Sequence, residues 1–339
     1  MTSVLDALNH GLLRALTDDP RVVLLGEDIL DPYGGAFKVT RGLSTAFPQR
    51  VLTTPVSEAG MTGLAAGMAL RGLRPVVEIM FGDFSTLAVD PLVNTAAKLR
   101  WMYNEQVSVP LVVRTPMGGR RGYGPTHSQS IEKLFLGVPG LRVVAASHFG
   151  DPGELLYRAI LRQDDPLVFI EHKLLYGLQV IDAAAASDFE IERTGSAELF
   201  PAYRLTVRGA PPPTLTLAAY GYMAELARQA LVRLAYEREL FAELIVLTQL
   251  APLDAAPILE SVSRTSRLLT AEEGSLSAGW GAEVLARCSE SLGNRLAAAG
   301  RVAAVETPIP AAAGLERSTL PEVDDILRAA EKIGAHPHV

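Results

Sequence analysis

Residues 54–85 read TPVSEAGMTGLAAGMALRGLRPVVEIMFGDFS, and this stretch decides the fold class. Its first part, EAGMTGLAAGMAL from Glu58, predicts a helix whose small residues let another backbone approach closely. RPVVEIM from Arg74 is a short apolar run rich in β-branched residues, which predicts a buried strand. The loop MFGDFS follows that strand directly. A helix that leads into a buried strand is the repeating unit of a sheet with parallel strands.

The same alternation continues on both sides of this stretch. Further buried strands are predicted to begin at Arg21, Pro110, Arg142 and Pro166, with helices over 4–16, 88–103 and 152–163. The rhythm weakens over 182–213, which contains AAAASD and a PPP run, and it restarts at Thr214. We therefore predict an α/β protein with two domains, 1–180 and 214–339, each a mostly parallel sheet flanked by helices. A linker over 181–213 is predicted to join them.

Composition narrows the classes of protein. The net charge is −7 and no basic stripe occurs, which argues against nucleic acid as a partner. The sequence contains no run of about 18 apolar residues, so no membrane span is predicted. Its first residues lack the basic flank and apolar block of a signal peptide. We therefore expect a cytoplasmic protein. The sequence also lacks a P-loop, a G-x-S-x-G elbow and histidines at zinc-ligand spacing, so these common enzyme classes are not indicated.

Glu58 is the first candidate for chemistry. It lies where a strand is predicted to give way to a helix, and the dipole of a helix N-terminus favours a carboxylate there. One interpretation is a helix-start acid with Ser57 as its cap. The other is a carboxyl group in an apolar pocket, where burial suits it to exchange a proton with a ring nitrogen.

Two loops carry further candidates. MFGDFS, from Met80 to Ser85, follows a strand, and open α/β sheets bind ligands at the carboxyl ends of their strands. Phe84 could stack on an aromatic ring or could belong to the core. The loop over 115–130 contains four glycines, two arginines and His127, a composition that suits the mouth of a site. His127 could act as a general acid or base, or could be a solvated loop residue.

Several segments together resemble one family. They follow in the same order as in the β subunits of pyruvate, branched-chain 2-oxo acid and acetoin dehydrogenases, which are transketolase-like. The resemblance is close over 20–176 and continues through the second domain. It is carried by the opening stretch and by GEDILDPYGGAFKVTRGL from Gly26, VNTAAKLR from Val93, VRTPMGG from Val113, THSQS from Thr126, VPGLRVV from Val138, APLD from Ala251, EEG from Glu272 and GWGAEVLAR from Gly279.

The resemblance implies a shared cofactor and a multi-subunit enzyme. In the family, thiamine diphosphate binds between an α and a β subunit. The β subunit holds the aminopyrimidine ring, and the α subunit holds the diphosphate through Mg²⁺. The enzyme decarboxylates a 2-oxo acid and passes the acyl group to the lipoyl arm of a dihydrolipoyl acyltransferase core. We therefore expect an α subunit as partner, in an α2β2 heterotetramer.

The resemblance also assigns roles by position. Glu58 matches the glutamate that hydrogen-bonds the pyrimidine N1′. Phe84 matches the aromatic residue packed on the pyrimidine, and Met80 lies on the same wall. His127 matches a histidine at the channel mouth that takes part in acyl transfer. Family members also hold a monovalent cation such as K⁺, and the matching positions are Leu111, Ala159, Gln163 and Asp165.

Departures from the family pattern leave the function partly open. VLTQLAPLD, from Val246, lacks an arginine that is common before the P-[LWF]-D motif of the family. The predicted linker and the segment VETPIPAAAGLERSTLP, from Val305, also differ from the usual forms. These changes bear on the acyl acceptor, which could instead be a carrier protein or a small molecule. The chain could also be half of a split transketolase or a non-catalytic scaffold.

Overall fold

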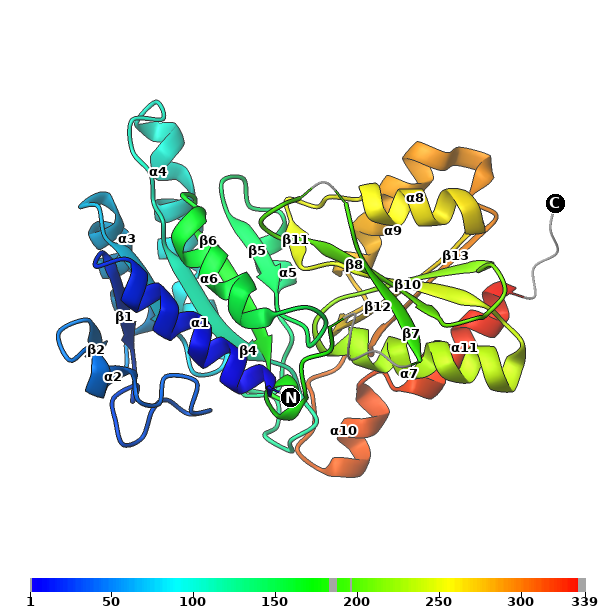
Figure 1. Ribbon diagram of the computed structural model, residues 1–339, viewed down its shortest axis with the longest axis horizontal. Coiled ribbons are helices and arrows are strands. Elements are labelled where there is room, and N and C mark those ends of the chain that lie inside the picture. Colours follow the sequence, from blue (N-terminus) through cyan, green and yellow to red (C-terminus); the bar gives the residue numbers. More distant parts are fainter. Residues whose placement is uncertain (1, 183–187, 196, 335–339) are drawn as a thin grey trace. The chain divides into compact units, whose positions relative to one another are not determined.

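The computed structural model describes residues 2–182, 188–195 and 197–334 (Figure 1). The chain divides into two compact units. The first comprises Met1–Gly118 and Leu134–Val180, and the second comprises Gly119–Lys133 and Ile181–Val339. The loop over 119–133, which we predicted within the first domain, therefore groups with the second unit.

The first unit contains a parallel sheet with the strand order β5-β6-β4-β3-β1-β2. Its strands are β1 (Val22–Gly26), β2 (Val51–Thr53), β3 (Arg74–Glu78), β4 (Val112–Met117), β5 (Arg142–Ala145) and β6 (Leu167–His172). Its helices are α1 (Val4–Asp18), α2 (Leu43–Ala46), α3 (Glu58–Leu70), η1 (Gly82–Ala88), η2 (Pro91–Ala96), α4 (Ala97–Met102), α6 (Pro152–Arg162) and η3 (Leu175–Gly177). α5 (Lys133–Leu136) begins at the boundary between the units.

The apolar runs of the sequence account for this sheet. All residues of β1, β3, β4 and β6 are buried, as expected for parallel strands covered on both faces. Helices α1 and α6 pack side by side (Figure 1). Gly11 and Gly153 lie at their contact, where a Cβ on Gly11 would come within 2.3 Å of the Gly153 carbonyl oxygen. Glycine is therefore required at this crossing.

The second unit contains a sheet with the order β13-β12-β9-β10-β8-β7. α8 and α9 cover one face in Figure 1, and α7 and α11 cover the other. The strands of this sheet are β7 (Phe189–Thr194), β8 (Ala202–Val207), β9 (Leu215–Ala219), β10 (Ala242–Val246), β12 (Arg267–Ser275) and β13 (Ala298–Ala304). The short strand β11 (Gln249–Ala251) is not part of it. The helices of this unit are α7 (Gly221–Arg238), α8 (Ala256–Thr265), α9 (Trp280–Leu292), η4 (Gly293–Arg295), α10 (Ala313–Thr319) and α11 (Val323–Gly334). The prediction of two mostly parallel sheets flanked by helices is confirmed.

Two details differ from the sequence-based expectation. The predicted linker over 181–213 contains β7 and β8, which pair antiparallel with each other, and β8 also pairs antiparallel with β10. Both strands lie toward one side of the sheet and are only partly buried, so their periodicity in the sequence is weak. Residues 183–187 and 196 of the predicted linker lie outside the described residues.

The predicted helix over 88–103 is helical through Met102, but its type changes along its length. It is divided among the end of η1, the π-helix η2 and α4. Pro91 begins η2, and a proline lacks the N–H group that an uninterrupted α-helix would use at that position.

Candidate active site

The candidate site of the first unit lies at the carboxyl edge of its sheet. Because all its strands are parallel, the residues that end or follow them gather at one edge. Glu27 follows β1, Glu78 ends β3 and Arg114 lies in β4. Glu58 begins α3, which packs on β1, β3 and η1.

Glu58 is the first residue of α3 and is 4% exposed. The Ser57 side chain caps the helix and accepts from the backbone N–H of Gly60 at 3.3 Å. Among the described residues, no side chain or backbone group forms a hydrogen bond or ion pair with the Glu58 carboxylate. The cap thus belongs to Ser57, and the buried carboxylate of Glu58 is left for another group.

Glu27 is a second buried carboxylate beside Glu58, and sequence reasoning missed it. It is 7% exposed, and its Oε1 atom has no hydrogen-bond partner among the described residues. The nearby Ser57 backbone N–H acts to lower its pKa. Burial raises the pKa of Glu27, and the charge of Glu58 raises it further. The available signal was its position: an acid directly after a buried strand, within the GED of a segment that resembles the family.

An aromatic wall lies on the segment after β3. Met80 and Phe84 are both half-buried. The Phe84 ring meets Phe81 edge-on with centroids 5.9 Å apart, and Phe81 meets Phe37 at 5.5 Å. Edge-to-face packing fixes the orientation of these rings. The half-exposed ring of Phe84 can therefore offer an apolar face to a planar ligand.

A buried ionic cluster lies on the neighbouring strands. Arg114 donates to both oxygens of Glu171, at 2.8 and 2.6 Å, and also pairs with Glu78. The Tyr176 hydroxyl donates to Glu171 at 2.6 Å. Burial raises the pKa of Glu78 despite the opposing charge of Arg114. We call these four residues the Arg114 cluster.

His127 lies in the second unit and is half-buried. Its Nδ1 atom is 2.9 Å from the Thr126 hydroxyl, and its backbone N–H donates to the Gly124 carbonyl at 3.2 Å. The loop that carries it is anchored by Arg120, which binds Glu273 at 3.3 Å and Glu322 at 2.5 Å. The positive charge of Arg120 is thus balanced by two carboxylates of the same chain.

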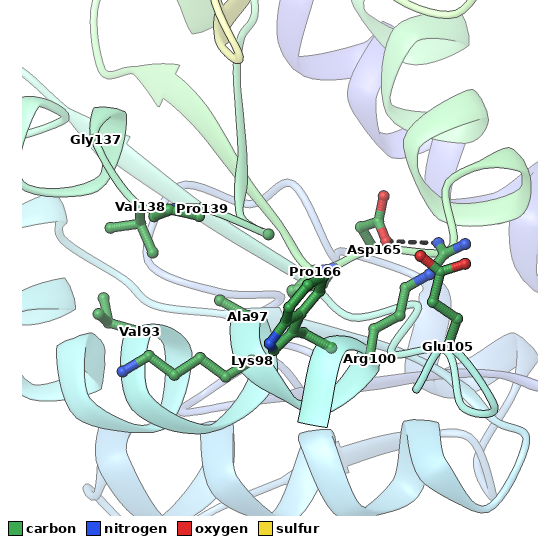
Figure 2. Close-up of a pocket in the computed structure, with 12 residues that line it drawn as sticks. Val93, Ala97, Lys98, Arg100, Glu105, Gly137, Val138, Pro139, Asp165 and Pro166 are labelled. Atoms are coloured by element: carbon green, nitrogen blue, oxygen red, sulfur yellow. Dashed lines mark hydrogen bonds and ion pairs between the residues drawn. The ribbon is translucent and has the colours of Figure 1, made fainter. Parts of the chain in front are cut away.

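A hollow of about 660 Å³ lies at the other edge of the first sheet (Figure 2). Its walls include Gly140, which precedes β5, and Pro166, which precedes β6. Trp101 at its rim is 84% exposed. Ligands of open α/β sheets bind at the carboxyl ends of the strands, and this hollow lies at the opposite edge.

The chain was compared with families of known proteins. Residues 1–179 match the model of the family "Transketolase, pyrimidine binding domain", and residues 207–326 match "Transketolase, C-terminal domain". A solved split-gene transketolase, an inactive β4 tetramer, is similar with a TM-score of 0.73 over 99% of both chains. At 19% identity, that likeness bears on the fold alone.

Three relatives show the family more closely. The pyruvate dehydrogenase E1 component subunit β-2 of Oryza sativa subsp. japonica is 40% identical, over 97% of this chain and 85% of its own. The pyruvate dehydrogenase E1 subunit β of Rickettsia conorii is 34% identical over 98% of both. The acetoin:2,6-dichlorophenolindophenol oxidoreductase subunit β of Cupriavidus necator is 36% identical, over 96% of this chain and 95% of its own.

The chain belongs to the β subunits of the 2-oxo acid dehydrogenases. The resemblance found in the sequence is thereby confirmed. Membership of this transketolase-like family implies dependence on thiamine diphosphate and a place in a multi-subunit enzyme.

The residues of this β subunit fit the pyrimidine half of thiamine diphosphate. Glu58, a buried carboxylate with no partner in the described part of the chain, lies at the start of α3. This helix packs on η1, which carries Phe84. An acid can meet the polar edge of a planar heterocycle while an aromatic ring covers its face. Among the described residues, no group of three or more His, Cys, Asp or Glu side chains could hold a metal ion.

The predicted positions of a monovalent cation lie around the end of α6. The Leu111 carbonyl accepts from the Leu167 N–H at 2.8 Å, and the Gln163 carbonyl accepts from Arg74 at 2.7 Å. The Asp165 carboxylate is paired with Arg100 at 2.9 Å. Ala159 is fully buried in α6. Each carbonyl oxygen keeps a second lone pair, and the cation stays a prediction.

Proposed function

We propose that this chain and an α subunit together form a thiamine diphosphate site that decarboxylates a 2-oxo acid of the pyruvate or branched-chain type. The observation that carries this proposal is the buried carboxylate of Glu58 at the carboxyl edge of the sheet, which has no partner among residues 2–182, 188–195 and 197–334. The bound cofactor would supply the nucleophilic carbon and the electron sink for decarboxylation. We assign Mg²⁺ and the diphosphate to the α subunit, as the resemblance implies.

In this proposal, the residues of the chain bind and orient the pyrimidine. Glu58 would hydrogen-bond N1′ and exchange a proton with it, because no other described group of the chain binds its carboxylate. Met80 and Phe84 pack on the ring and exclude water from it. A dry site strengthens the hydrogen bond between Glu58 and the ring nitrogen.

Helix α3 offers a surface for the α subunit. Leu64 on α3 is 57% exposed, and Val56, just before the helix, is 81% exposed. Gly63 and Gly67 are exposed on the same helix, and a Cβ on either would meet no atom within 4 Å. Apolar side chains beside glycines let a partner backbone approach closely, as a cofactor shared between two subunits requires.

The proposal also includes the transfer of the acyl group to an acceptor. We propose that His127 assists transfer of the acyl group to the lipoyl arm of an acyltransferase core. A carrier protein or small molecule stays the alternative acceptor, while a split-transketolase half and a scaffold are not favoured by the named relatives. No helix among the described residues is long and apolar enough to cross a bilayer. The cytoplasmic location and the α2β2 assembly stay predictions.

The first experiment is co-purification with the α subunit, followed by calorimetric titration with thiamine diphosphate and Mg²⁺. The wild-type pair should bind the cofactor, and neither subunit should bind it alone. The Glu58→Gln pair should bind it more weakly. Glu290→Gln, which changes an exposed acid on α9, is the matched control and should behave as wild type. Unchanged binding by the Glu58→Gln pair would contradict the proposed site.

A second experiment separates the two half-reactions. His127→Ala should slow acyl transfer to a lipoyl acceptor more than it slows decarboxylation measured with an artificial electron acceptor. A loss of about 10²-fold in transfer is the expected size for one general acid or base. Equal losses in the two half-reactions would remove His127 from acyl transfer.

A further inference from the structure

The loop of the second unit that carries His127 begins with a run of left-handed backbone conformations. Arg120, Gly122 and Gly124 all have positive φ angles, at +68°, +70° and +76°. Glycine adopts this region easily, but a residue with a Cβ atom does so only where its surroundings enforce it. The backbone at Arg120 therefore needs partners that hold it in this conformation.

Glu316 on α10 is such a partner. Its Oε1 atom accepts from the Arg120 backbone N–H at 2.8 Å, and its Oε2 atom accepts from the Gly122 backbone N–H at 3.1 Å. Left-handed residues that alternate with ordinary ones turn their N–H groups to one side and form a concave site for an anion. In this chain the anion is the carboxylate of Glu316, which is 4% exposed. We call this arrangement the Glu316 clamp.

The loop also packs closely on the residues around α10. A Cβ atom on Gly119 would come within 2.6 Å of the Leu320 Cδ1 atom, and one on Gly122 would come within 3.2 Å of the Ala311 carbonyl oxygen. The glycines thus let the backbone of the loop approach the helix that carries Glu316. Both oxygens of one buried carboxylate are used on this approach, so the clamp fixes two peptide groups at once.

The clamp lies a short way before His127 along the chain. Gly124 follows Gly122 by two residues, and its carbonyl accepts from the His127 backbone N–H at 3.2 Å. The Pro125 carbonyl accepts from the Gln129 side chain at 2.9 Å, which closes the loop on itself around His127. A shift of the backbone at Gly122 would therefore be passed to the imidazole.

We propose that Glu316 is a positioning residue that holds the loop over 119–130, and with it His127, in the geometry needed for acyl transfer. This inference rests on the proposed role of His127. Glu316 acts through the backbone of the loop, whereas Glu273 and Glu322 bind the side chain of Arg120. The loss of Glu316 should therefore disturb the position of His127 even while the ion pairs of Arg120 remain.

Hydrogen exchange in the full-length chain tests the clamp itself. Glu316→Ala removes the acceptor of the Arg120 and Gly122 N–H groups, and exchange in the peptide over 119–124 should become about tenfold faster or more. Glu316→Gln keeps the shape of the side chain and one acceptor oxygen, so its increase should be smaller. Glu290→Gln, an exposed acid on α9, is the control and should exchange as wild type does.

Unchanged exchange in Glu316→Ala would overturn the proposal. Should that variant fail to fold, Glu316→Gln decides the question, because its amide nitrogen cannot accept from the second N–H group. Faster exchange over 119–124 in Glu316→Gln supports the clamp, and exchange at the wild-type rate overturns it.

The two half-reactions, measured in the complex with the α subunit, distinguish positioning from a merely structural role. Glu316→Ala should slow acyl transfer to a lipoylated domain by up to about 10²-fold, the cost of a misplacement of about 1 Å, while decarboxylation stays within about threefold of wild type. The loss should lie in kcat and not in KM for the lipoylated domain, because the reacting step needs the imidazole in place. Glu316→Gln should recover part of the rate. Equal losses in both half-reactions would overturn the positioning role.

A double-mutant cycle separates this inference from the proposed function. In a chain that already carries His127→Ala, Glu316→Ala should slow acyl transfer little further, because the group that it positions is gone. Fully additive losses would overturn the link between Glu316 and His127 and leave the role of His127 standing. Wild-type transfer by His127→Ala alone would overturn the proposed role of His127 and this inference with it.

Discussion

The first sheet places two sets of buried acids at the same edge, and the two sets differ in whether a basic side chain of the chain binds them. In the Arg114 cluster, Glu78 and Glu171 share a guanidinium that is 1% exposed. The pair of Glu27 and Glu58 is as deeply buried, yet no basic side chain binds it in the described part of the chain. Acids that the fold itself satisfies hold strands together. Acids that the fold leaves without a cation are available to a ligand.

The two sets of acids also differ in how many elements of the fold they connect. Arg114 joins the carboxyl ends of β3, β4 and β6, so its contacts fix three strands at once. Glu27 joins only the end of β1 to the start of α3. Removing a member of the first set should therefore cost mainly stability, and removing a member of the second should cost mainly chemistry. Four substitutions can test that separation, beginning with the largest expected effect.

Glu58→Gln should lower decarboxylation in the complex with the α subunit by about 10²- to 10⁴-fold, the usual worth of a positioned proton-transfer group. Its unfolding free energy should change by less than about 1 kcal/mol, because no bond within the chain is lost. Single-turnover decarboxylation and urea unfolding measure the two effects. A large loss of stability with retained decarboxylation would reverse the comparison.

Arg114→Met should lower the unfolding free energy by about 3–5 kcal/mol, because it leaves two buried carboxylates without their cation. Urea unfolding of the isolated chain measures this loss. Arg158→Met is the control: Arg158 pairs with Glu154 at 2.7 Å on α6, where both side chains are about one-third exposed. Its expected loss is below about 1 kcal/mol. Similar losses in the two variants would show that the Arg114 cluster is not structural.

Glu272→Gln extends the comparison to the second unit, where an acid is satisfied by backbone groups. The N–H groups of Trp280 and Gly281 donate to Glu272 at 2.7 and 2.9 Å. Burial nevertheless raises the pKa of Glu272 from 4.5 to about 7. The raised value favours the protonated form in the folded state, so stability should be lost as the pH rises from about 4.5 to about 7.

That loss should reach about 3 kcal/mol in the wild type and should be smaller in Glu272→Gln. Urea midpoints measured across this pH range give the slope for each protein. Glu283→Gln changes an exposed acid on α9, the helix whose first N–H groups bind Glu272, and should keep the wild-type slope. A Glu272→Gln slope as steep as that of wild type would show that Glu272 titrates at its ordinary value.

Tyr176→Phe should have the smallest effect, a loss of about 1 kcal/mol, because it removes one hydrogen bond to Glu171 while Arg114 still holds that carboxylate. Thermal unfolding can resolve the difference against Tyr236→Phe, whose ring is 77% exposed and which should change nothing. A loss as large as that of Arg114→Met would mean that the hydroxyl, and not the guanidinium, organises the cluster.

The sequence correctly predicted those features of the fold that depend on local residue patterns. Apolar runs located the buried strands β1, β3, β4 and β6, and the spacing of Ser57 and Glu58 located the start of α3. The order of motifs indicated the family, which the relatives confirm. The roles given to Glu58, Met80, Phe84 and His127 stay predictions until the half-reactions and cofactor binding are measured.

What the sequence did not predict depends on distant residues. Arg114 and Glu171 are 57 residues apart, and no local pattern pairs them. Glu27 looks like any acid after a strand until the fold brings Ser57 to it. β7 and β8 escaped recognition because partly exposed strands lack the continuous apolar run of buried ones.

The crossing of α1 and α6 has a consequence for how the chain is made. α1 buries Leu8, Leu12 and Leu16, and it meets α6 where Gly11 faces Gly153. A ribosome that adds about 5–20 residues per second needs on the order of ten seconds to travel from one glycine to the other. Throughout that interval the leucine face of α1 cannot pack against α6, because α6 has not yet been synthesised. Helix α1 is therefore a segment whose apolar face is exposed to aggregation during synthesis.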